Sequence, residues 1–285
     1  MNLSYLFLSG RILLTGCERI VVNRLGQNTE SLSGAFVYFG TATIFLVPCL
    51  FIVPVPESFH FLVIAAASGF VYSFAFWLFV KSLTSGDVSL VAPLYHYNVF
   101  FLMALTALFL NEHFSIGKLA GLLLLVYGTT FLKKAKNPVL AGIRVFKDRA
   151  CLMMIGCSFL MAIGRTIDAY MVRSVQPVFY AFFIYLFISL FLFLFHIPTR
   201  RLPLVFQPLT QKPGIAVLSG ALNAFSYLFL LLAVKKIEMS IAEPLSMLGM
   251  VVTVILARII LKESIHGRLT GVLIMIAGAW LLLLV

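Results

Sequence analysis

The chain has 285 residues, of which 62% are hydrophobic and only 11% are charged, and its formal net charge is +11. Soluble globular proteins contain about 45–50% apolar and about 25% charged residues. A mean hydropathy of +1.08 leaves too few polar side chains to cover a water-soluble particle. The composition therefore excludes an ordinary soluble domain and predicts an integral membrane protein.

Ten apolar runs follow one another along the chain, most of them near the length of about 20 residues that crosses a hydrocarbon core about 30 Å thick. We predict transmembrane helices at residues 3–22, 32–53, 59–83, 88–110, 115–132, 151–172, 177–197, 214–234, 239–261 and 267–285. The longest connections, 133–150 and 198–213, are basic and contain prolines, at which a helix is not expected to continue.

The positive charge does not indicate nucleic-acid binding. Lys and Arg lie between the apolar runs, where such residues set membrane orientation and meet anionic headgroups. No basic stripe with interleaved aromatic residues lies outside those runs, so we expect the lipid bilayer, and no nucleic acid, as a partner. The densest basic cluster consists of Lys133, Lys134, Lys136, Arg144, Lys147 and Arg149.

The second half of the chain repeats the first. A shift of 151 residues superimposes glycine, proline and glutamate, which each restrict backbone or polarity. The matched positions are Ser68-Gly69 with Ser219-Gly220, Phe74 with Phe225, Ser89 with Ser240, Pro93-Leu94 with Pro244-Leu245, and Glu112 with Glu263. With one residue removed, Gly117, Leu119, Gly121 and Gly128 match Gly267, Leu269, Gly271 and Gly278.

Five helices is an odd number, so the second half must enter the membrane from the opposite side. The sequence therefore predicts an all-α integral membrane fold of ten transmembrane helices in two inverted five-helix repeats, residues 1–132 and 151–285, joined by a basic connecting loop at 133–150. Transporters use this architecture because exchanging the conformations of the two halves opens a midplane site to the other face.

The repeated residues resemble the drug/metabolite transporter superfamily, specifically its EamA-type ten-helix members, over nearly the whole chain. In the first half the resemblance lies in Phe79, the stretch from Gly86 to Leu94, Asn111-Glu112, Gly121 and Gly128. In the second half it lies in the stretch from Ser240 to Leu245, Lys262-Glu263, Gly271 and Gly278. The resemblance implies a secondary transporter or exporter with a central cavity lined by the first, third and fourth helices of each half.

Charged residues inside apolar runs are candidates for the substrate site, because an ionised group at mid-membrane costs about 3 kcal/mol or more without a partner or water. The first run carries Arg11, Glu18 and Arg19, and the sixth carries Arg165 and Asp168. Residues three apart share a helix face, so Arg165 and Asp168 can pair. Mixed charge would suit a zwitterionic solute, whereas Glu18 and Arg19 can alternatively extend to the headgroups.

Glu243 precedes Pro244 at the position that matches Ala92, so only one half carries a carboxylate there. One interpretation is a substrate-binding or proton-carrying acid. The other is a favourable helix start, because proline suits the first helical position and an acid suits the positive end of the helix dipole.

Polar and aromatic residues of the third, fourth and eighth runs complete the predicted cavity wall, although aromatic stripes more often serve packing. Lipid would not accept the polar groups of His96 and Asn98 without partners. Tyr72 and Asn223 coincide under the repeat shift. The predicted wall consists of Tyr72, Phe76, Trp77, His96, Asn98, Asn223 and Tyr227.

The remaining repeated residues are interpreted as scaffold. Gly117-xxx-Gly121 and Gly267-xxx-Gly271 are patterns that let helices approach closely. Glu112 and Glu263 precede the fifth and tenth runs by about one turn, so we expect each to cap the helix that follows it. The sequence contains no HExxH, phosphate-binding glycine loop, GxSxG or convergent metal-ligand set, so no catalytic residue, metal or cofactor is expected.

The orientation of the termini stays open. Connections on the side opposite the N-terminus contain thirteen Lys or Arg, and those on the N-terminal side contain four. This bias would place both termini outside the cytoplasm, whereas the family resemblance implies the reverse.

These observations predict a multi-pass protein of the cytoplasmic (inner) cell membrane that moves a small polar or zwitterionic metabolite, with an amino acid or related compound as first candidate, by alternating access. Coupling to protons through Glu18, Asp168 or Glu243 is a hypothesis. Two alternatives are a multidrug or lipophilic-cation exporter and a non-transporting membrane scaffold protein. Monomer and homodimer are both compatible with the sequence.

Overall fold

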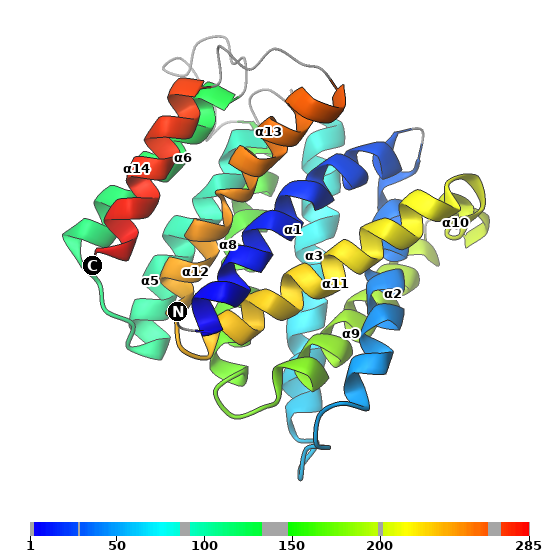
Figure 1. Ribbon diagram of the computed structural model, residues 1–285. Helices are drawn as coiled ribbons and strands as arrows, with labels where there is room; N and C mark the ends of the chain where they lie inside the picture. The colour runs from blue at the N-terminus through cyan, green and yellow to red at the C-terminus, as the bar shows by residue number, and fades with distance from the viewer. Residues whose placement is uncertain are drawn as a thin grey trace. The chain divides into compact units, whose positions relative to one another are not determined.

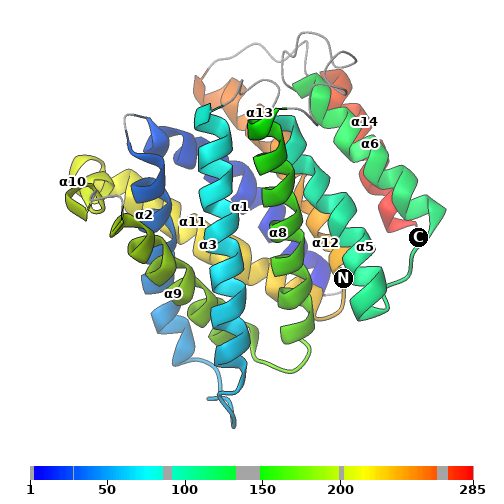
Figure 2. The same ribbon diagram turned by 180° about the vertical axis from the view of Figure 1, so that it is seen from behind.

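The computed structural model describes residues 3–27, 29–85, 92–132, 148–198, 202–261 and 269–284, and within these ranges the chain forms helices and no strand (Figure 1, Figure 2). The elements, in chain order, are α1 (Leu3–Gly26), α2 (Ser31–Leu50), α3 (Phe61–Ser85), η1 (Ala92–Tyr97), α5 (Asn98–Leu110), α6 (Ile116–Leu132), α8 (Arg149–Met171), α9 (Pro177–His196), η2 (Leu202–Leu204), α10 (Gln207–Gln211), α11 (Pro213–Val234), α12 (Met239–Ser246), α13 (Gly249–Leu261) and α14 (Leu269–Leu283). The prediction of an all-helical fold is confirmed.

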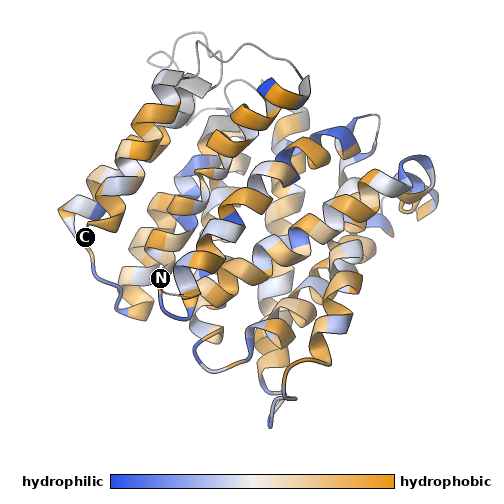
Figure 3. Ribbon diagram, viewed as in Figure 1, coloured by the Kyte–Doolittle hydropathy of each residue, from blue (hydrophilic) through white to orange (hydrophobic). Residues whose placement is uncertain are grey.

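Six helical stretches among the described residues are long and apolar enough to cross a membrane, namely Ser31–Leu50, Phe61–Leu83, Arg149–Met171, Pro177–His196, Pro213–Val234 and Met239–Leu256. Helix α1 has 24 residues, but four charged side chains interrupt its apolar surface. Figure 3 shows hydrophobic residues along most helices and hydrophilic residues at α10 and at the C-terminal end of α1. The chain is therefore a multi-pass membrane protein.

Two of the predicted helices are broken. The run 88–110 contains the 3₁₀ helix η1 before α5, and the run 239–261 is divided into α12 and α13. Pro244 lies inside α12, where its missing N–H removes one helical hydrogen bond, and Gly249 begins α13 after a turn. Hydropathy does not reveal either break, because the apolar residues continue through it.

The connection 198–213 also differs from its prediction as a non-helical segment, since it contains η2 and α10. Pro203 and Pro208 each occupy the second position of one of these short helices. Proline is tolerated there because the first-turn N–H groups have no partner inside the helix in any case.

The described helices pack into two compact units. The first unit comprises Met1–Phe74 and Ile167–Lys236, and the second comprises Ala75–Thr166 and Ile237–Val285. The boundaries fall inside α3 and α8, so both helices contribute residues to both units. Each unit thus combines helices from the two halves of the sequence, and the division into repeats at 1–132 and 151–285 stays a prediction.

In the first unit, α1 packs antiparallel to α11. The Phe7 ring, near the start of α1, lies 5.6 Å from the Phe229 ring near the end of α11. At the other end of the pair, the Lys212 ammonium donates a 2.8 Å hydrogen bond to the Arg24 carbonyl. Helices α2 and α9 are also antiparallel, because Ser33 Oγ near the start of α2 lies 3.1 Å from His196 Nε2 at the end of α9.

Two glycines allow close backbone approaches in the first unit. A Cβ atom at Gly220 of α11 would lie 2.8 Å from the Ala42 nitrogen of α2 and would also meet the Thr41 side chain. A Cβ atom at Gly69 of α3 would lie 2.7 Å from Phe187 Cβ of α9. Real Cβ atoms do not approach so closely, so any larger residue would push these helices apart.

In the second unit, α6 and α14 form the most extensive helix pair, and glycines again line it. A Cβ atom at Gly121 would lie 2.9 Å from the Gly278 carbonyl oxygen, and a Cβ atom at Gly128 would lie 2.9 Å from the Gly271 carbonyl oxygen. Because the earlier glycine of α6 faces the later glycine of α14, the two helices run antiparallel. The predicted small-residue packing role of Gly121 is therefore consistent with this contact.

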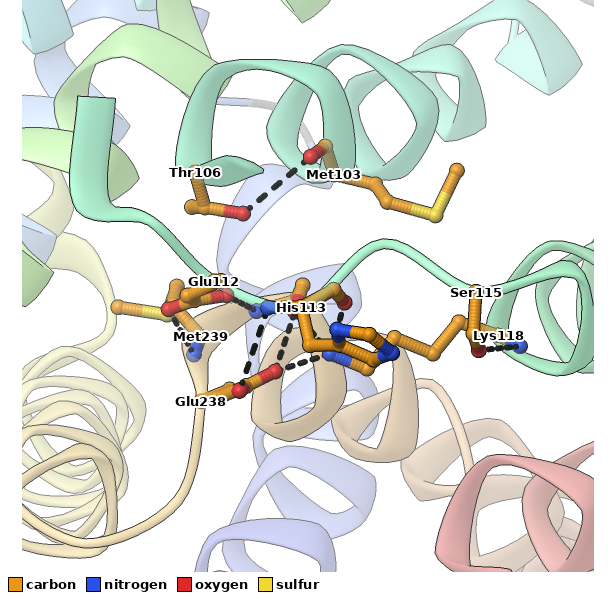
Figure 4. Close-up of polar contacts among 9 residues, drawn as sticks. Met103, Thr106, Glu112, His113, Ser115, Lys118, Glu238 and Met239 are labelled. Carbon is orange, nitrogen blue, oxygen red and sulfur yellow. Dashed lines mark hydrogen bonds and ion pairs between the residues drawn. The ribbon is translucent and has the colours of Figure 1, made fainter. Parts of the chain in front are cut away.

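Helix α5 ends in a left-handed turn that directs the following residue away from the helix. Asn111 has φ 53°, which asparagine tolerates better than most residues do. The Glu112 N–H donates a 3.2 Å hydrogen bond to the Thr106 carbonyl and closes the turn. Figure 4 shows the Glu112 side chain leaving this turn toward Met239.

Glu112 caps a helix of the other half of the chain. Its carboxylate accepts hydrogen bonds from the backbone N–H groups of Met239 (2.8 Å) and Ser240 (2.9 Å), the first two residues of α12. The expectation that Glu112 caps the helix following it in sequence, α6, is therefore wrong. A carboxylate satisfies the unpaired first-turn donors of whichever helix start lies beside it. Glu263, expected to do the same, lies outside the described residues.

A buried lysine strengthens the same junction (Figure 4). The Lys118 side chain is only 2% exposed, and its ammonium is paired with the Glu238 carboxylate. The ammonium also donates to the His113 carbonyl (2.6 Å) and to Ser240 Oγ (3.3 Å). A buried charge persists only with such partners, so this junction fixes the α5–α6 connection against the start of α12.

Replacing Gly121 with alanine should destabilise the protein by about 1–3 kcal/mol, the usual cost of overpacking, because backbone atoms of α14 cannot move aside. The matched control is Gly156→Ala in α8, whose Cβ atom would lie an ordinary 3.7 Å from Leu78 Cδ1. Thermal unfolding of the detergent-purified variants measures the difference. Equal melting temperatures for the two variants would contradict the described α6–α14 contact.

Glu112→Ala should cost about 1–3 kcal/mol, because two backbone donors at buried Met239 and Ser240 lose their acceptor. Glu112→Gln, which keeps one acceptor oxygen, should fall between this variant and wild type. Glu57→Ala removes an exposed carboxylate and serves as the control. Hydrogen exchange of the first turn of α12 should accelerate most in Glu112→Ala, less in Glu112→Gln and not in Glu57→Ala, and unchanged exchange in Glu112→Ala would refute the cap.

Candidate functional site

Polar side chains on the apolar helices form the candidate site, because each must find partners away from water. Asp168 of α8 is fully buried in the first unit. Its two carboxylate oxygens accept hydrogen bonds from Tyr72 of α3 (2.6 Å) and Tyr180 of α9 (2.9 Å). A carboxyl held by two hydroxyls can gain or lose a proton without losing every partner.

The second unit contains an ion pair between α8 and α12. Arg165 Nε lies 3.4 Å from Glu243 Oε1, and both side chains are 12% exposed. Glu243 is the fifth residue of α12, so the interpretation of Glu243 and Pro244 as a helix start is wrong. The helix begins earlier, at Met239, where Glu112 supplies the acceptor for its first donors. The predicted pairing of Arg165 with Asp168 stays a prediction.

A second buried polar group of the first unit joins α1 to α11. The Arg11 guanidinium donates to Ser226 Oγ, and Thr15 Oγ1 lies 3.2 Å from the same oxygen. One turn earlier on α11, Asn223 Oδ1 accepts a 2.7 Å hydrogen bond from Tyr185 of α9. Sequence reasoning noted Arg11 but did not include it, or Tyr185, among the site residues.

Tyr227 and Glu18 also lie in the first unit. The Tyr227 ring stacks on the Tyr185 ring with centroids 4.7 Å apart and planes inclined by 17°. The half-buried Glu18 carboxylate of α1 accepts a hydrogen bond from Tyr38 of α2. Glu18 therefore has a protein partner on the neighbouring helix.

The remaining predicted wall residues lie in the second unit. Phe76 and Trp77 of α3 are half-buried, and the Lys81 ammonium lies 4.6 Å from the Trp77 ring centroid, a cation–π distance. His96 of η1 is half-buried, and Asn98, the first residue of α5, is buried.

Helix α8 holds η1 in place. The single Ser158 hydroxyl lies within hydrogen-bond distance of the backbone carbonyls of Leu94 (3.0 Å) and Tyr95 (3.3 Å) of η1, and of the Met154 carbonyl (2.9 Å) in its own helix. The Tyr95 ring packs edge-on against Phe79 of α3, with centroids 5.5 Å apart. These contacts position the backbone that carries His96, and no sequence pattern singled out Ser158.

No three His, Cys, Asp or Glu side chains gather as a metal site requires within the described part of the chain. The candidate residues thus comprise the buried Asp168 carboxyl and the buried Arg11 guanidinium in the first unit, and the half-buried ion pair of Arg165 and Glu243 in the second, together with hydroxyl, amide and aromatic side chains. Groups of these kinds can form hydrogen bonds with a polar solute, and those among the described residues include no preassembled nucleophile–base pair.

The sequence model of the EamA-like transporter family matches residues 2–133 and 148–284. Among curated proteins, none matches the sequence. A solved structure titled only "Crystal structure of protein" is similar to this chain, with a TM-score of 0.76 and 12% sequence identity, over 99% of this chain and 96% of that one. At this identity the likeness shows the fold alone. Since the family match extends over almost the entire sequence, the chain belongs to the EamA-like transporter family of the drug/metabolite transporter superfamily.

Proposed function

We propose that this membrane transporter is a secondary transporter or exporter of a small polar or zwitterionic metabolite in the cytoplasmic membrane, with an amino acid or related compound as first candidate. Ten spans in two inverted five-helix repeats would work by alternating access. Ionisable groups of both signs that are buried or half-buried on the helices carry the proposal. Arg165 and Glu243 supply one pair of opposite charges, and Arg11 and Asp168 are further buried ionisable groups.

The contacts in the second unit support the inverted repeats. Under the repeat relation, Gly121 corresponds to Gly271 and Gly128 corresponds to Gly278. Exchanging the halves therefore converts the contact of Gly121 with Gly278 into that of Gly128 with Gly271, and both contacts are present. A local two-fold axis between antiparallel helices has this property.

The first unit supports the same relation. Gly69 and Gly220 correspond under the shift of 151 residues. Gly69 meets α9 and Gly220 meets α2, and these are the second helices of the two predicted repeats. The two halves therefore correspond in the helix that each glycine contacts as well as in the position of the glycine.

A zwitterionic substrate is favoured because the buried groups offer both kinds of partner. The carboxylates Asp168 and Glu243 can accept from an ammonium group, and Arg165 can donate to a carboxylate. The proposed substrate-binding set is that of the sequence analysis: Glu18, Tyr72, Phe76, Trp77, His96, Asn98, Arg165, Asp168, Asn223, Tyr227 and Glu243. Asp168 and Glu243 are also the proposed carriers of a coupling proton, with Glu18 as a third.

A thermal-stability screen of the detergent-purified protein against amino acids, nucleosides and organic cations tests the substrate class. A ligand that binds only the folded state at a hundredfold excess over Kd stabilises by about 2.7 kcal/mol. We expect a zwitterionic hit that Asp168→Asn or Glu243→Gln abolishes and that Glu57→Gln, at an exposed position, retains. Hits confined to lipophilic cations would favour the multidrug alternative, and no hit at all would favour a scaffold.

Proton coupling is tested by uptake into proteoliposomes with and without an imposed pH gradient. Among variants that still exchange substrate, neutralising the coupling carboxyl should abolish the response of uptake to the gradient. The variants are Glu18→Gln, Asp168→Asn and Glu243→Gln. If all three respond to the gradient as wild type does, proton coupling through these residues is wrong.

A further inference from the structure

Arg11 is a charge without a counter-ion among the described residues of the first unit. It is the ninth residue of the 24-residue helix α1, and it is only 8% exposed. Arginine stays protonated in proteins. Within the described part of the chain its guanidinium has one hydrogen-bond partner, the neutral Ser226 hydroxyl, and Nε has none. Glu18 is seven residues away, about 10 Å along the helix, and is bonded to Tyr38.

Asn223 presents a second unused donor on the face of α11 that carries Ser226, because residues three apart share a helix face. Asn223 is 4% exposed. Its Oδ1 accepts a hydrogen bond from the Tyr185 hydroxyl, which leaves the amide Nδ2 as the donor that is still available. Nδ2 is buried and has no hydrogen-bond partner among the described residues.

The related helix pair supplies a contrast. Asn223 corresponds under the repeat shift to Tyr72, whose hydroxyl donates to the internal carboxylate of Asp168. Tyr72 and Asp168 lie on α3 and α8, and Asn223 and Arg11 lie on their counterparts α11 and α1. The pair α3 and α8 thus contains a carboxyl group as acceptor, whereas the pair α11 and α1 contains a guanidinium cation and further hydrogen-bond donors.

We propose that Arg11, Asn223 and Ser226 form an oxyanion subsite that binds the carboxylate of the transported solute, an inference that rests on the proposed transport function. A planar guanidinium and an amide N–H₂ suit the two oxygens of a carboxylate. Arg11 is the one cation of this group, so its single charge matches a monoanion better than a phosphate dianion. Alternating access would admit the solute to residues that are buried in this conformation.

Thermal-shift titrations of the detergent-purified full chain test the subsite with three probes: the common amino acids, the corresponding amino-acid amides, and inorganic phosphate. The amides keep the ammonium and the side chain but lack the carboxylate. We expect amino acids to protect wild type and the amides to fail. Arg11→Met should weaken amino-acid binding about 10- to 100-fold, and Asn223→Ala about fivefold, as loss of a charge-assisted and of a neutral hydrogen bond implies.

The control Arg173→Met removes the same charge from an exposed position and should bind as wild type does. Arg11→Met without ligand should melt at or above the wild-type temperature, because it removes a charge that has no counter-ion, whereas a purely structural Arg11 would lower it.

Equal amino-acid binding by Arg11→Met and wild type would overturn the subsite and leave the transport proposal standing. Protection by the amides alone would do the same. Arg11-dependent protection by phosphate alone would overturn the carboxylate assignment. Protection by none of the three probes, combined with no uptake in proteoliposomes, would overturn the subsite and the transport proposal together.

Discussion

Close approach of helix backbones is the constraint on which the described packing depends. Lipid tails are as apolar as leucine, so helices in a membrane gain little from hiding apolar side chains and must gain from van der Waals contact instead. The glycines supply that contact: Gly121 and Gly128 admit the backbone of α14, and Gly69 and Gly220 admit those of α9 and α2. A methyl group at any of these positions would collide with the neighbouring helix.

Within this packing, polar groups take positions where neighbouring helices of one unit meet. Asp168 is held by tyrosines of α3 and α9, Arg165 faces Glu243 of α12, and Arg11 faces Ser226 of α11. A buried charge is costly unless partners surround it, so these groups also bind neighbouring helices together. In the proposed transport cycle the same side chains would contribute to packing in one state and contact the solute in another.

Much of the helical framework could be predicted from hydropathy because apolar runs of membrane length admit few other structures. The breaks before α5 and between α12 and α13 could not be predicted, since the apolar pattern continues through both. The partners of the charged residues were also beyond prediction. Arg11 meets Ser226, and Glu112 meets Met239, across 215 and 127 residues of sequence, and no local spacing encodes such contacts. Tyr180 and Tyr185 lie in a run of phenylalanines that carries no polar signal.

The cap that Glu112 places on α12 has a consequence for biosynthesis. During translation the N-terminal part of a chain emerges first. The Glu112 carboxylate therefore exists long before the backbone donors of Met239 and Ser240, to which it is bonded in the finished protein. Helix α12 starts against an acceptor that the earlier half has already made. The earlier half thus acts as a template for the later one, and a chain cut between the halves would have to recover in trans a contact that the continuous chain makes in cis.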